Sequence, residues 1–430
     1  ILSIISVQLL NIDFLSKLSF HFLNSTICVS IFFSLNREKV NLPYIFLNIF
    51  FLLFFLIAPL SQLTINPVSL INTLPFNQNE IIFGNILLAL HIVGVILGNF
   101  GTIKKTIQKP LNNHNFLFRK KNMIFMFLIT LVIFTPLYIE DILSKFSILS
   151  LNENDDVGTI TNLIWNKTIK IFPLFFVWYF FRKYSGFGKY FLLFLALILL
   201  LLAKNPIVEH RNSFGAVFLF CALLFTRKII IKKRIVQVSM FIFFPLLFSA
   251  GAFLAPHRFK SDSLFEEIST QFNTVHFDAW ANYIAGFNYV SNKGFFYGEQ
   301  LLGTLLFWVP RSIWETKPIG TGMVIGEYLM EKHSHWFSNI SSTLPLEGYM
   351  DFGFIGIIIY GFIIGKIIKK LSVGFDKFDL DNLVSIFIVC NIFFLYRGPL
   401  LSSFAFTIGG CIGIAFISKF CQKISNISFK

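Results

Sequence analysis

The chain has 430 residues, of which 55% are hydrophobic and 13% are charged, and its mean hydropathy is +0.71. A soluble protein of this length needs a larger polar surface, so the composition excludes a water-soluble globular protein and indicates an integral membrane protein. The five cysteines have no metal-ligand spacing and lie outside the polar stretch 256–350, so we expect neither a disulfide framework nor a metal site.

Apolar stretches recur along the whole chain, and a helix needs roughly 20 apolar residues to cross the hydrocarbon core of a bilayer. The candidates, in chain order, are 18–35, 43–60, 81–99, 122–139, 168–181, 190–203, 212–226, 235–255, 351–365, 383–396 and 398–417. Residues 1–15 are also apolar and would belong to a twelfth span. We therefore predict an all-α polytopic membrane protein with about 11–12 transmembrane helices.

The polar stretches between these spans alternate in charge. The basic set comprises 36–42, 100–121, 182–189, 227–234, 366–382 and 418–430. It holds 23 of the 36 Lys and Arg residues and four of the 22 acids. Because Lys and Arg concentrate on the cytoplasmic side of membrane proteins, this set predicts the cytoplasmic face. The net charge of +14 is thus a signal of topology, and we expect no nucleic acid partner.

One connection on the opposite face is far longer than the others. It runs from 256 to 350 and is rich in Trp, Tyr and Phe, which argues against disorder. Within it, 301–309 is apolar but too short to cross a bilayer, so we expect it on the membrane surface or re-entering the membrane. The predicted organisation is one integral membrane domain, with N-terminal spans in 1–255, a large extracytoplasmic loop with short helices in 256–350, and C-terminal spans in 351–430.

Several cations oppose the charge bias because they lie on the predicted extracytoplasmic side. A cation at a membrane boundary must reach water, pair with an acid such as Glu209 or Asp262, or bind a ligand. Arg and Lys together match the geometry and charge of a phosphate. Their number on one face favours an anion site, although the glycines near Lys317 match neither a P-loop nor a Rossmann fingerprint. The candidates are Arg211, Arg258, Arg311, Lys317 and Arg397.

Acids and histidines flank the end of the same loop. Glu347 and Asp351 are four residues apart and share one face if this stretch is helical. Their simplest role is to stabilise a helix N-terminus. The alternative is that one of them accepts a proton from an attacking hydroxyl, and His333 and His335 are further candidates for that general base.

Three stretches resemble the O-antigen and oligosaccharide repeat-unit polymerases, the Wzy-type bacterial membrane family. They are PRSIWETKPIG at 310–320, PLEGYMDFGFIGIII at 345–359 and YRGPLLSS at 396–403. The second contains Glu–x–Tyr–x–x–Phe–Gly, a pattern usual in that family before the ninth span. The number of spans and the large outer loop are also similar.

The resemblance implies a glycosyltransferase of the bacterial inner membrane whose active site faces the periplasm. Donor and acceptor would be oligosaccharide repeat units on undecaprenyl pyrophosphate, and a chain-length regulator would be a further membrane partner. The cations named above would hold the pyrophosphate. No cofactor is implied, because the donor arrives already activated on its lipid.

Two other functions remain open from the sequence. An O-antigen ligase would have a similar architecture and would differ chiefly in its acceptor. A lipid-linked oligosaccharide flippase or other transporter is less compatible, because transporters typically have short loops of similar length, internal repeats and charged residues inside their spans.

Overall fold

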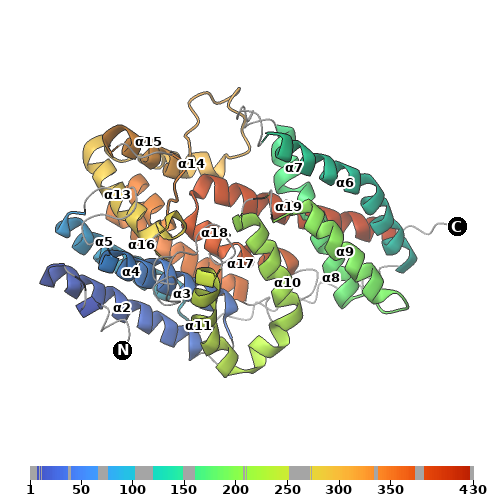
Figure 1. Ribbon diagram of the computed structural model, residues 1–430, viewed down its shortest axis with the longest axis horizontal. Helices are drawn as coiled ribbons and strands as arrows, with labels where there is room; N and C mark the ends of the chain where they lie inside the picture. Colours follow the sequence, from blue (N-terminus) through green and yellow to red (C-terminus); the bar gives the residue numbers. More distant parts are fainter. Residues whose placement is uncertain are drawn as a thin grey trace, which may run out of the picture.

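The computed structural model describes residues 7–8, 10, 12–36, 40–65, 76–101, 120–148, 160–206, 209, 211–250, 272, 274–333, 338–372 and 382–426. All regular secondary structure in these residues is helical (Figure 1), which confirms the predicted all-α class.

Every apolar stretch predicted to be a span lies largely in helix. The first half of the chain forms α2 (Phe14–Leu35), α3 (Leu42–Leu52), the π-helical turn η1 (Leu53–Ile57), α4 (Ala58–Ile65), α5 (Gln78–Asn99), α6 (Lys120–Ile148), α7 (Ile160–Lys167), the 3-10 turn η2 (Ile169–Ile171), α8 (Phe172–Arg182), α9 (Lys189–Ala203), α10 (Arg211–Lys232) and α11 (Arg234–Ala250). The second half forms the 3-10 turn η3 (Val275–Phe277), α13 (Ala279–Lys293), α14 (Glu299–Leu305), α15 (Thr321–His333), α16 (Leu344–Ser372), α17 (Leu383–Cys390), α18 (Ile392–Arg397) and α19 (Leu400–Asn426).

Not every predicted span has the length to cross a bilayer as one straight helix. Among the described residues, six helical runs are long and apolar enough: Phe14–Leu35, Leu42–Thr64, Gln78–Asn99, Lys120–Leu143, Leu344–Ser372 and Leu400–Ile424. Three more apolar helices are shorter: Lys189–Ala203, Ser213–Thr226 and Arg234–Leu246. The stretch 383–396 is divided at Asn391 into α17 and α18. The structure thus agrees with a polytopic membrane protein and gives six full-length span candidates.

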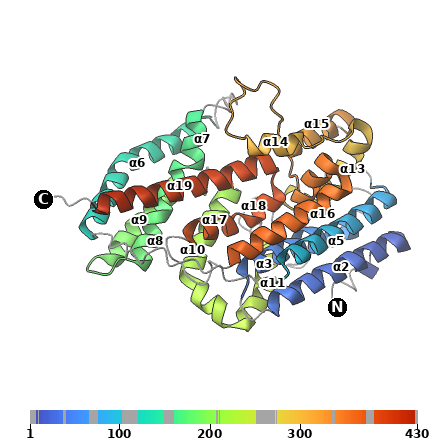
Figure 2. The same cartoon turned by 180° about the vertical axis from the view of Figure 1, so that it is seen from behind.

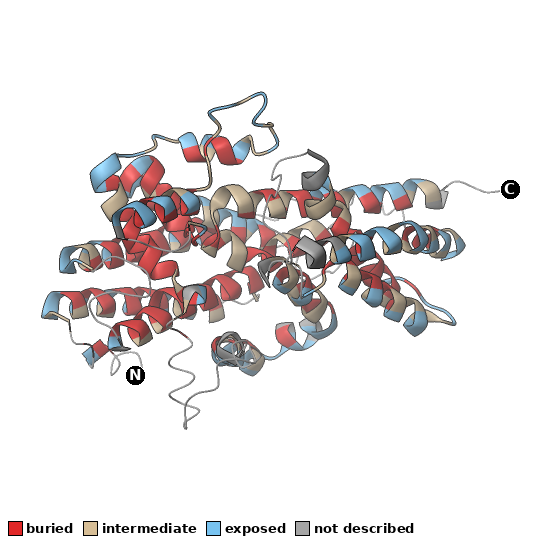
Figure 3. Cartoon of the chain, turned by 45° about the horizontal axis from the view of Figure 1, so that its top comes forward, coloured by how far each residue is buried: buried red, intermediate tan, exposed pale blue. Residues whose placement is uncertain are grey.

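The outer faces of the long helices are apolar. Exposed large hydrophobic side chains follow α2, α6, α9, α16 and α19, among them Phe14, Phe22, Phe32, Val132, Phe191, Phe194, Phe354, Ile359, Ile412 and Phe416. Such broad apolar exposure destabilises a protein in water, whereas it matches the hydrocarbon interior of a bilayer. Figure 3 shows the buried residues on the inward sides of the helices.

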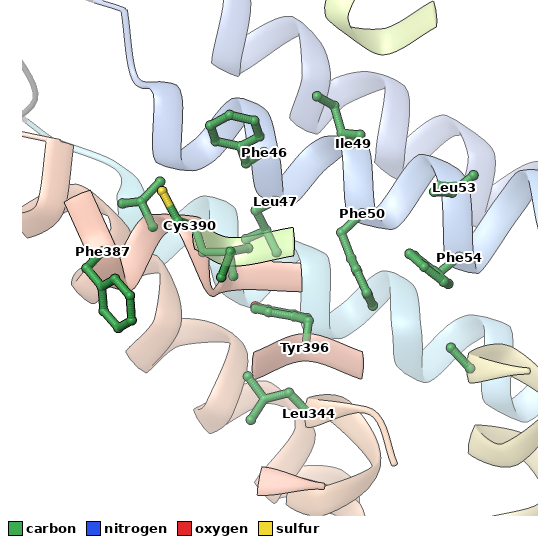
Figure 4. Packing of buried hydrophobic residues seen from close by; sticks show 14 of the residues in the cluster. Phe46, Leu47, Ile49, Phe50, Leu53, Phe54, Leu344, Phe387, Cys390 and Tyr396 are labelled. Atoms are coloured by element: carbon green, nitrogen blue, oxygen red, sulfur yellow. The ribbon is translucent and has the colours of Figure 1, made fainter. Parts of the chain in front are cut away.

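Aromatic side chains fill the core between α3, α16 and the broken helix α17–α18 (Figure 4). Phe50 contacts Tyr396, with ring centroids 5.4 Å apart, and Phe46 contacts Phe244 at 5.6 Å. Offset and edge-to-face contacts of this kind add to the packing of large apolar rings. This packing holds α18, and with it Arg397 at its end, against the centre of the bundle.

Glycines allow α5 and α16 to pack very closely. A Cβ on Gly94 would lie 2.8 Å from the carbonyl oxygen of Ile358, and a Cβ on Gly98 would overlap the carbonyl oxygen of Phe362. On the other helix, a Cβ on Gly361 or Gly365 would meet the backbone of α5. Small residues that let helix backbones approach are typical of membrane-spanning pairs. Gly361 and Gly365 therefore permit the close approach of α16 to α5.

We expect Gly98→Ala to destabilise the protein, because the added methyl group meets backbone that cannot rotate away. The cost is about 1–3 kcal/mol for overpacking. The control is Gly215→Ala in α10, where a Cβ has no heavy atom within 4 Å. Thermal unfolding in detergent should show a lower midpoint for the first variant and an unchanged or higher midpoint for the second, because alanine favours a helix more than glycine does. Equal midpoints would contradict the close α5–α16 contact.

A kink near its start divides α16 into a short arm and a long helix. Phe352 (φ −136°, ψ 15°) and Gly353 (φ 65°, ψ −153°) leave the helical region. The positive φ at Gly353 is one that glycine adopts at little cost. The arm packs back on the long helix where Gly348 approaches Gly356. Gly353 therefore shapes the kink rather than a helix–helix contact.

The described part of the long loop is folded. Its helices α13, α14 and α15 lie together at one end of the molecule (Figures 1 and 2). Trp280 and Tyr283 of α13 are fully buried, and Trp280 donates a hydrogen bond to Asn85 of α5 at 3.0 Å. On α14, Leu302 and Leu305 are about half exposed, and the position of 301–309 on or in the membrane stays a prediction.

Hydrogen bonds join the predicted cytoplasmic stretches to one another. Lys369 donates to the carbonyl oxygen of Phe100 at 2.8 Å, and Lys120 donates to that of Ser185 at 2.6 Å. These residues belong to the basic stretches 100–121, 182–189 and 366–382 or adjoin them. These contacts bring together helix ends that border basic stretches, and the cytoplasmic side assigned to them stays a prediction.

Candidate functional site

Two cations organise the loop between α14 and α15. Arg311 donates through Nη1 to the carbonyl oxygen of Lys317 (2.6 Å) and through Nη2 to that of Pro318 (3.2 Å). Lys317 Nζ donates to the carbonyl oxygens of Phe307 (2.7 Å) and Val309 (2.8 Å). We call Arg311 and Lys317 the loop cation pair. Burial and the positive charge of Arg311 lower the pKa of Lys317, so the two charges lie close together.

The loop cation pair is not neutralised by the described residues. The ion pairs found in that part of the chain use Lys170, Lys204 and Arg397, and neither Arg311 nor Lys317 takes part in one. Each side chain also retains N–H donors beyond those bonded to carbonyl oxygens, since a guanidinium has five and an ammonium three. Two adjacent cations with spare donors can bind an anion.

A third cation, Lys167, lies near the same loop, because it sits over Phe406 and the ring of the nearby Phe404 contacts Phe307 of the loop. It ends α7, and its Nζ lies 4.7 Å from the centroid of the Phe406 ring of α19. Burial and the positive charge of Lys317 lower the pKa of Lys167 to about 8. Figures 1 and 2 both show the α14–α15 loop extending toward α7. Lys167 is not among the cations predicted from the sequence, although its place outside the basic set at a span boundary was a usable signal.

Arg397 has a partner within the protein. Its Nη2 lies 3.0 Å from Asp278 Oδ1. That carboxylate also accepts hydrogen bonds from Ser341 Oγ at 2.7 Å and Asn282 Nδ2 at 2.8 Å. Of the roles considered for a cation at a membrane boundary, Arg397 therefore has the one in which it pairs with an acid, and that acid is Asp278. The interaction holds the end of α18 to α13 and to the segment before α16.

Glu347 is 2% exposed and joins three segments. Its Oε2 accepts a hydrogen bond from Thr321 Oγ1 at 2.5 Å, and its Oε1 accepts from the backbone N–H of Leu400 at 2.9 Å. Thr321 begins α15 and Leu400 begins α19. The carboxylate is therefore placed at the positive end of the α19 dipole. Glu347 therefore stabilises helix N-termini, as the simplest interpretation of the sequence predicts, but these are the N-termini of α15 and α19 and not that of its own helix.

Asp351 is 1% exposed, and its carboxylate accepts hydrogen bonds from the N-terminus of α14. Its Oδ1 accepts from the N–H of Gln300 at 3.2 Å, and its Oδ2 accepts from the N–H of Leu301 at 2.9 Å. Tyr360 Oη is a further partner of Oδ2 at 3.4 Å. These two N–H groups belong to the first turn of α14, which has no intrahelical acceptors for them.

The two acids lie before the α16 kink and do share a face, as predicted. Together, Glu347 and Asp351 bind the N-termini of α14, α15 and α19. The loop cation pair lies in the connection between α14 and α15.

The glycines after Lys317 serve close packing. A Cβ on Gly320 would lie 3.3 Å from Pro399 Cβ, and one on Gly322 would lie 2.9 Å from Pro399 Cγ. A Cβ on Gly326 would overlap the backbone of Ser338. These contacts bring the stretch after the loop cation pair against the α18–α19 turn.

A separate network of buried ion pairs lies at the helix ends near α7. Lys170, 1% exposed, contacts Asp141 at 2.7 Å and Glu209 at 2.6 Å, and Lys204 contacts Glu209 at 3.2 Å. Removing one member of such a buried network is costly because the remaining charge loses its partner. The network accounts for Lys170 and Lys204 without a ligand.

The remaining candidates lie outside the described residues. These are Arg258 and His335, together with the side chains of Arg211 and His333. Of the five predicted cations, the structure therefore brings Arg311 and Lys317 into contact, places Arg397 on Asp278, and adds Lys167. The chain matches no protein-family model, no curated protein and no solved structure in the corresponding searches.

Proposed function

We propose that this protein polymerises oligosaccharide repeat units carried on undecaprenyl pyrophosphate, by glycosyl transfer on the extracytoplasmic face of the bacterial inner membrane. The observation that carries the proposal is the loop cation pair, Arg311 and Lys317, which has no carboxylate partner among the described residues. The pair occurs at one end of an apolar helical bundle, within one of the stretches that resemble the polymerase family.

The physical reason is the charge of the leaving group. In the reaction, the bond between the anomeric carbon of the growing chain and the diphosphate oxygen breaks. A new bond forms between that carbon and a hydroxyl of the incoming unit. The hydroxyl proton passes to a base, and undecaprenyl pyrophosphate departs with the bonding electrons. Fixed cations beside the diphosphate stabilise this developing negative charge.

The buried acids suggest which groups do not carry the proton. Glu347 and Asp351 have their oxygens occupied by helix N-termini and by Thr321 or Tyr360. His333 and His335, whose side chains lie outside the described residues, stay general-base candidates from the sequence.

Purified full-length protein, supplied with lipid-linked single repeat units, should convert them into a ladder of longer chains and release undecaprenyl pyrophosphate. Transfer of the glycan to lipid A core without lengthening would favour a ligase. Movement of the units between leaflets with unchanged chain length would favour a flippase and contradict the proposal.

A further inference from the structure

The last two residues of α7 border a small hollow between α7, α10, α18 and α19. Asn166, Lys167, Ser213 and Phe406 contribute to its wall. Its free space holds about one group of the size of a water molecule or a hydroxyl. Phe406 in its wall is two residues from Phe404, whose ring lies 6.1 Å from that of Phe307 in the loop, and the carbonyl oxygen of Phe307 accepts a hydrogen bond from Lys317.

Lys167 is the uncompensated charge of this hollow. The other cation in the wall, Lys204, is neutralised by Glu209 at 3.2 Å. Lys167 enters no ion pair among the described residues, and the positive charge of Lys317 acts on it. The Phe406 ring stabilises the ammonium in part. An anion between Lys167 and Lys317 would relieve their repulsion.

Asn166 offers the complementary hydrogen-bonding group. Its Oδ1 is buried and accepts no hydrogen bond from the described residues. Buried polar atoms in folded proteins nearly always have a partner, so this oxygen calls for a donor inside the hollow. A ligand suited to both residues carries a negative charge and, next to it, a hydroxyl group.

We propose that Asn166 and Lys167 form the sugar-side end of the diphosphate site. Lys167 binds the phosphate that bears the sugar, and Asn166 Oδ1 accepts a hydrogen bond from a hydroxyl of that sugar. The inference rests on the proposed function, and it extends the site from the α14–α15 loop to α7. Lys167 is thereby a substrate-binding residue.

The test is equilibrium binding to the purified full-length protein in nanodiscs with two probes, farnesyl diphosphate and glucosyl farnesyl diphosphate. Lys167→Met, which keeps the aliphatic stem over Phe406, should weaken both probes at least about tenfold, which corresponds to one lost charge-assisted contact. Lys167→Arg should restore most of the affinity. Lys293→Met, at an exposed lysine of α13, is the matched control and should change neither.

Asn166→Leu should weaken the glucosyl probe and leave farnesyl diphosphate unaffected. Equal loss for both probes, or for neither, would overturn the role of Asn166. Wild-type affinity in Lys167→Met, while Arg311→Ala loses binding, would overturn this inference and leave the proposed function standing. Failure of the wild-type protein to bind either probe would overturn both.

Discussion

Arg311→Ala is expected to abolish glycan chain extension, with a loss of at least about 100-fold in the rate of repeat-unit transfer. The substitution removes one of two adjacent cations that we assign to the leaving diphosphate. Arg311→Lys should retain an intermediate rate, because the charge remains but the planar fork of donors is lost. The measurement is the length distribution of glycans formed from lipid-linked single units.

Arg311 also bonds to two backbone carbonyl oxygens of its own loop, so a control must separate charge from loop shape. Glu315→Gln alters an exposed position between the two cations and should leave the ladder unchanged. Measuring farnesyl diphosphate binding in the same variants ties the loss to the anion. A normal ladder from Arg311→Ala would remove Arg311 from the site.

Glu347→Ala is expected to prevent accumulation of folded protein. The change leaves the buried N–H of Leu400 without an acceptor, which costs about 1–3 kcal/mol for that group alone. It also releases Thr321 at the start of α15. Size-exclusion profiles and thermal unfolding in detergent should show aggregation or a markedly lower midpoint.

Glu347→Gln distinguishes an anchoring carboxylate from a general base. The amide retains an acceptor for Leu400 N–H and a donor for Thr321 Oγ1, but it does not accept a proton at neutral pH. We expect this variant to fold and to extend chains at a rate close to wild type. A folded but inactive Glu347→Gln protein would instead identify Glu347 as the base.

The helical class and the position of the apolar segments follow from the sequence because membrane spans are long, uniformly apolar and set by bilayer thickness. The charge of the connecting stretches also predicts which helix ends face the cytoplasm. The packing glycines Gly361 and Gly365 have a recognisable spacing. The length of individual spans was less predictable, because the break at Asn391 between α17 and α18 carries no proline or glycine signal.

The candidate site was predicted in part. Proximity of Arg311 and Lys317 follows from their short separation and the turn-forming residues around them. The partner of Arg397 did not follow, because Asp278 is 119 positions away in the chain. Lys167 reaches the site through the packing of α7 on α19, a tertiary contact without a local sequence pattern. The roles of Glu347 and Asp351 also depend on tertiary contacts, because their carboxylate oxygens accept hydrogen bonds from the beginnings of helices elsewhere in the chain.

The most direct test of the account is the side of the membrane on which the loop cation pair lies. In a chain whose five cysteines are replaced by alanine, Glu315→Cys places a thiol between Arg311 and Lys317, and Phe187→Cys places one in the basic stretch 182–189. A membrane-impermeant maleimide is expected to label the cysteine at position 315 in intact spheroplasts and the cysteine at position 187 only after permeabilisation. The reverse pattern would place the cations in the cytoplasm, away from the extracytoplasmic substrate, and would contradict the account.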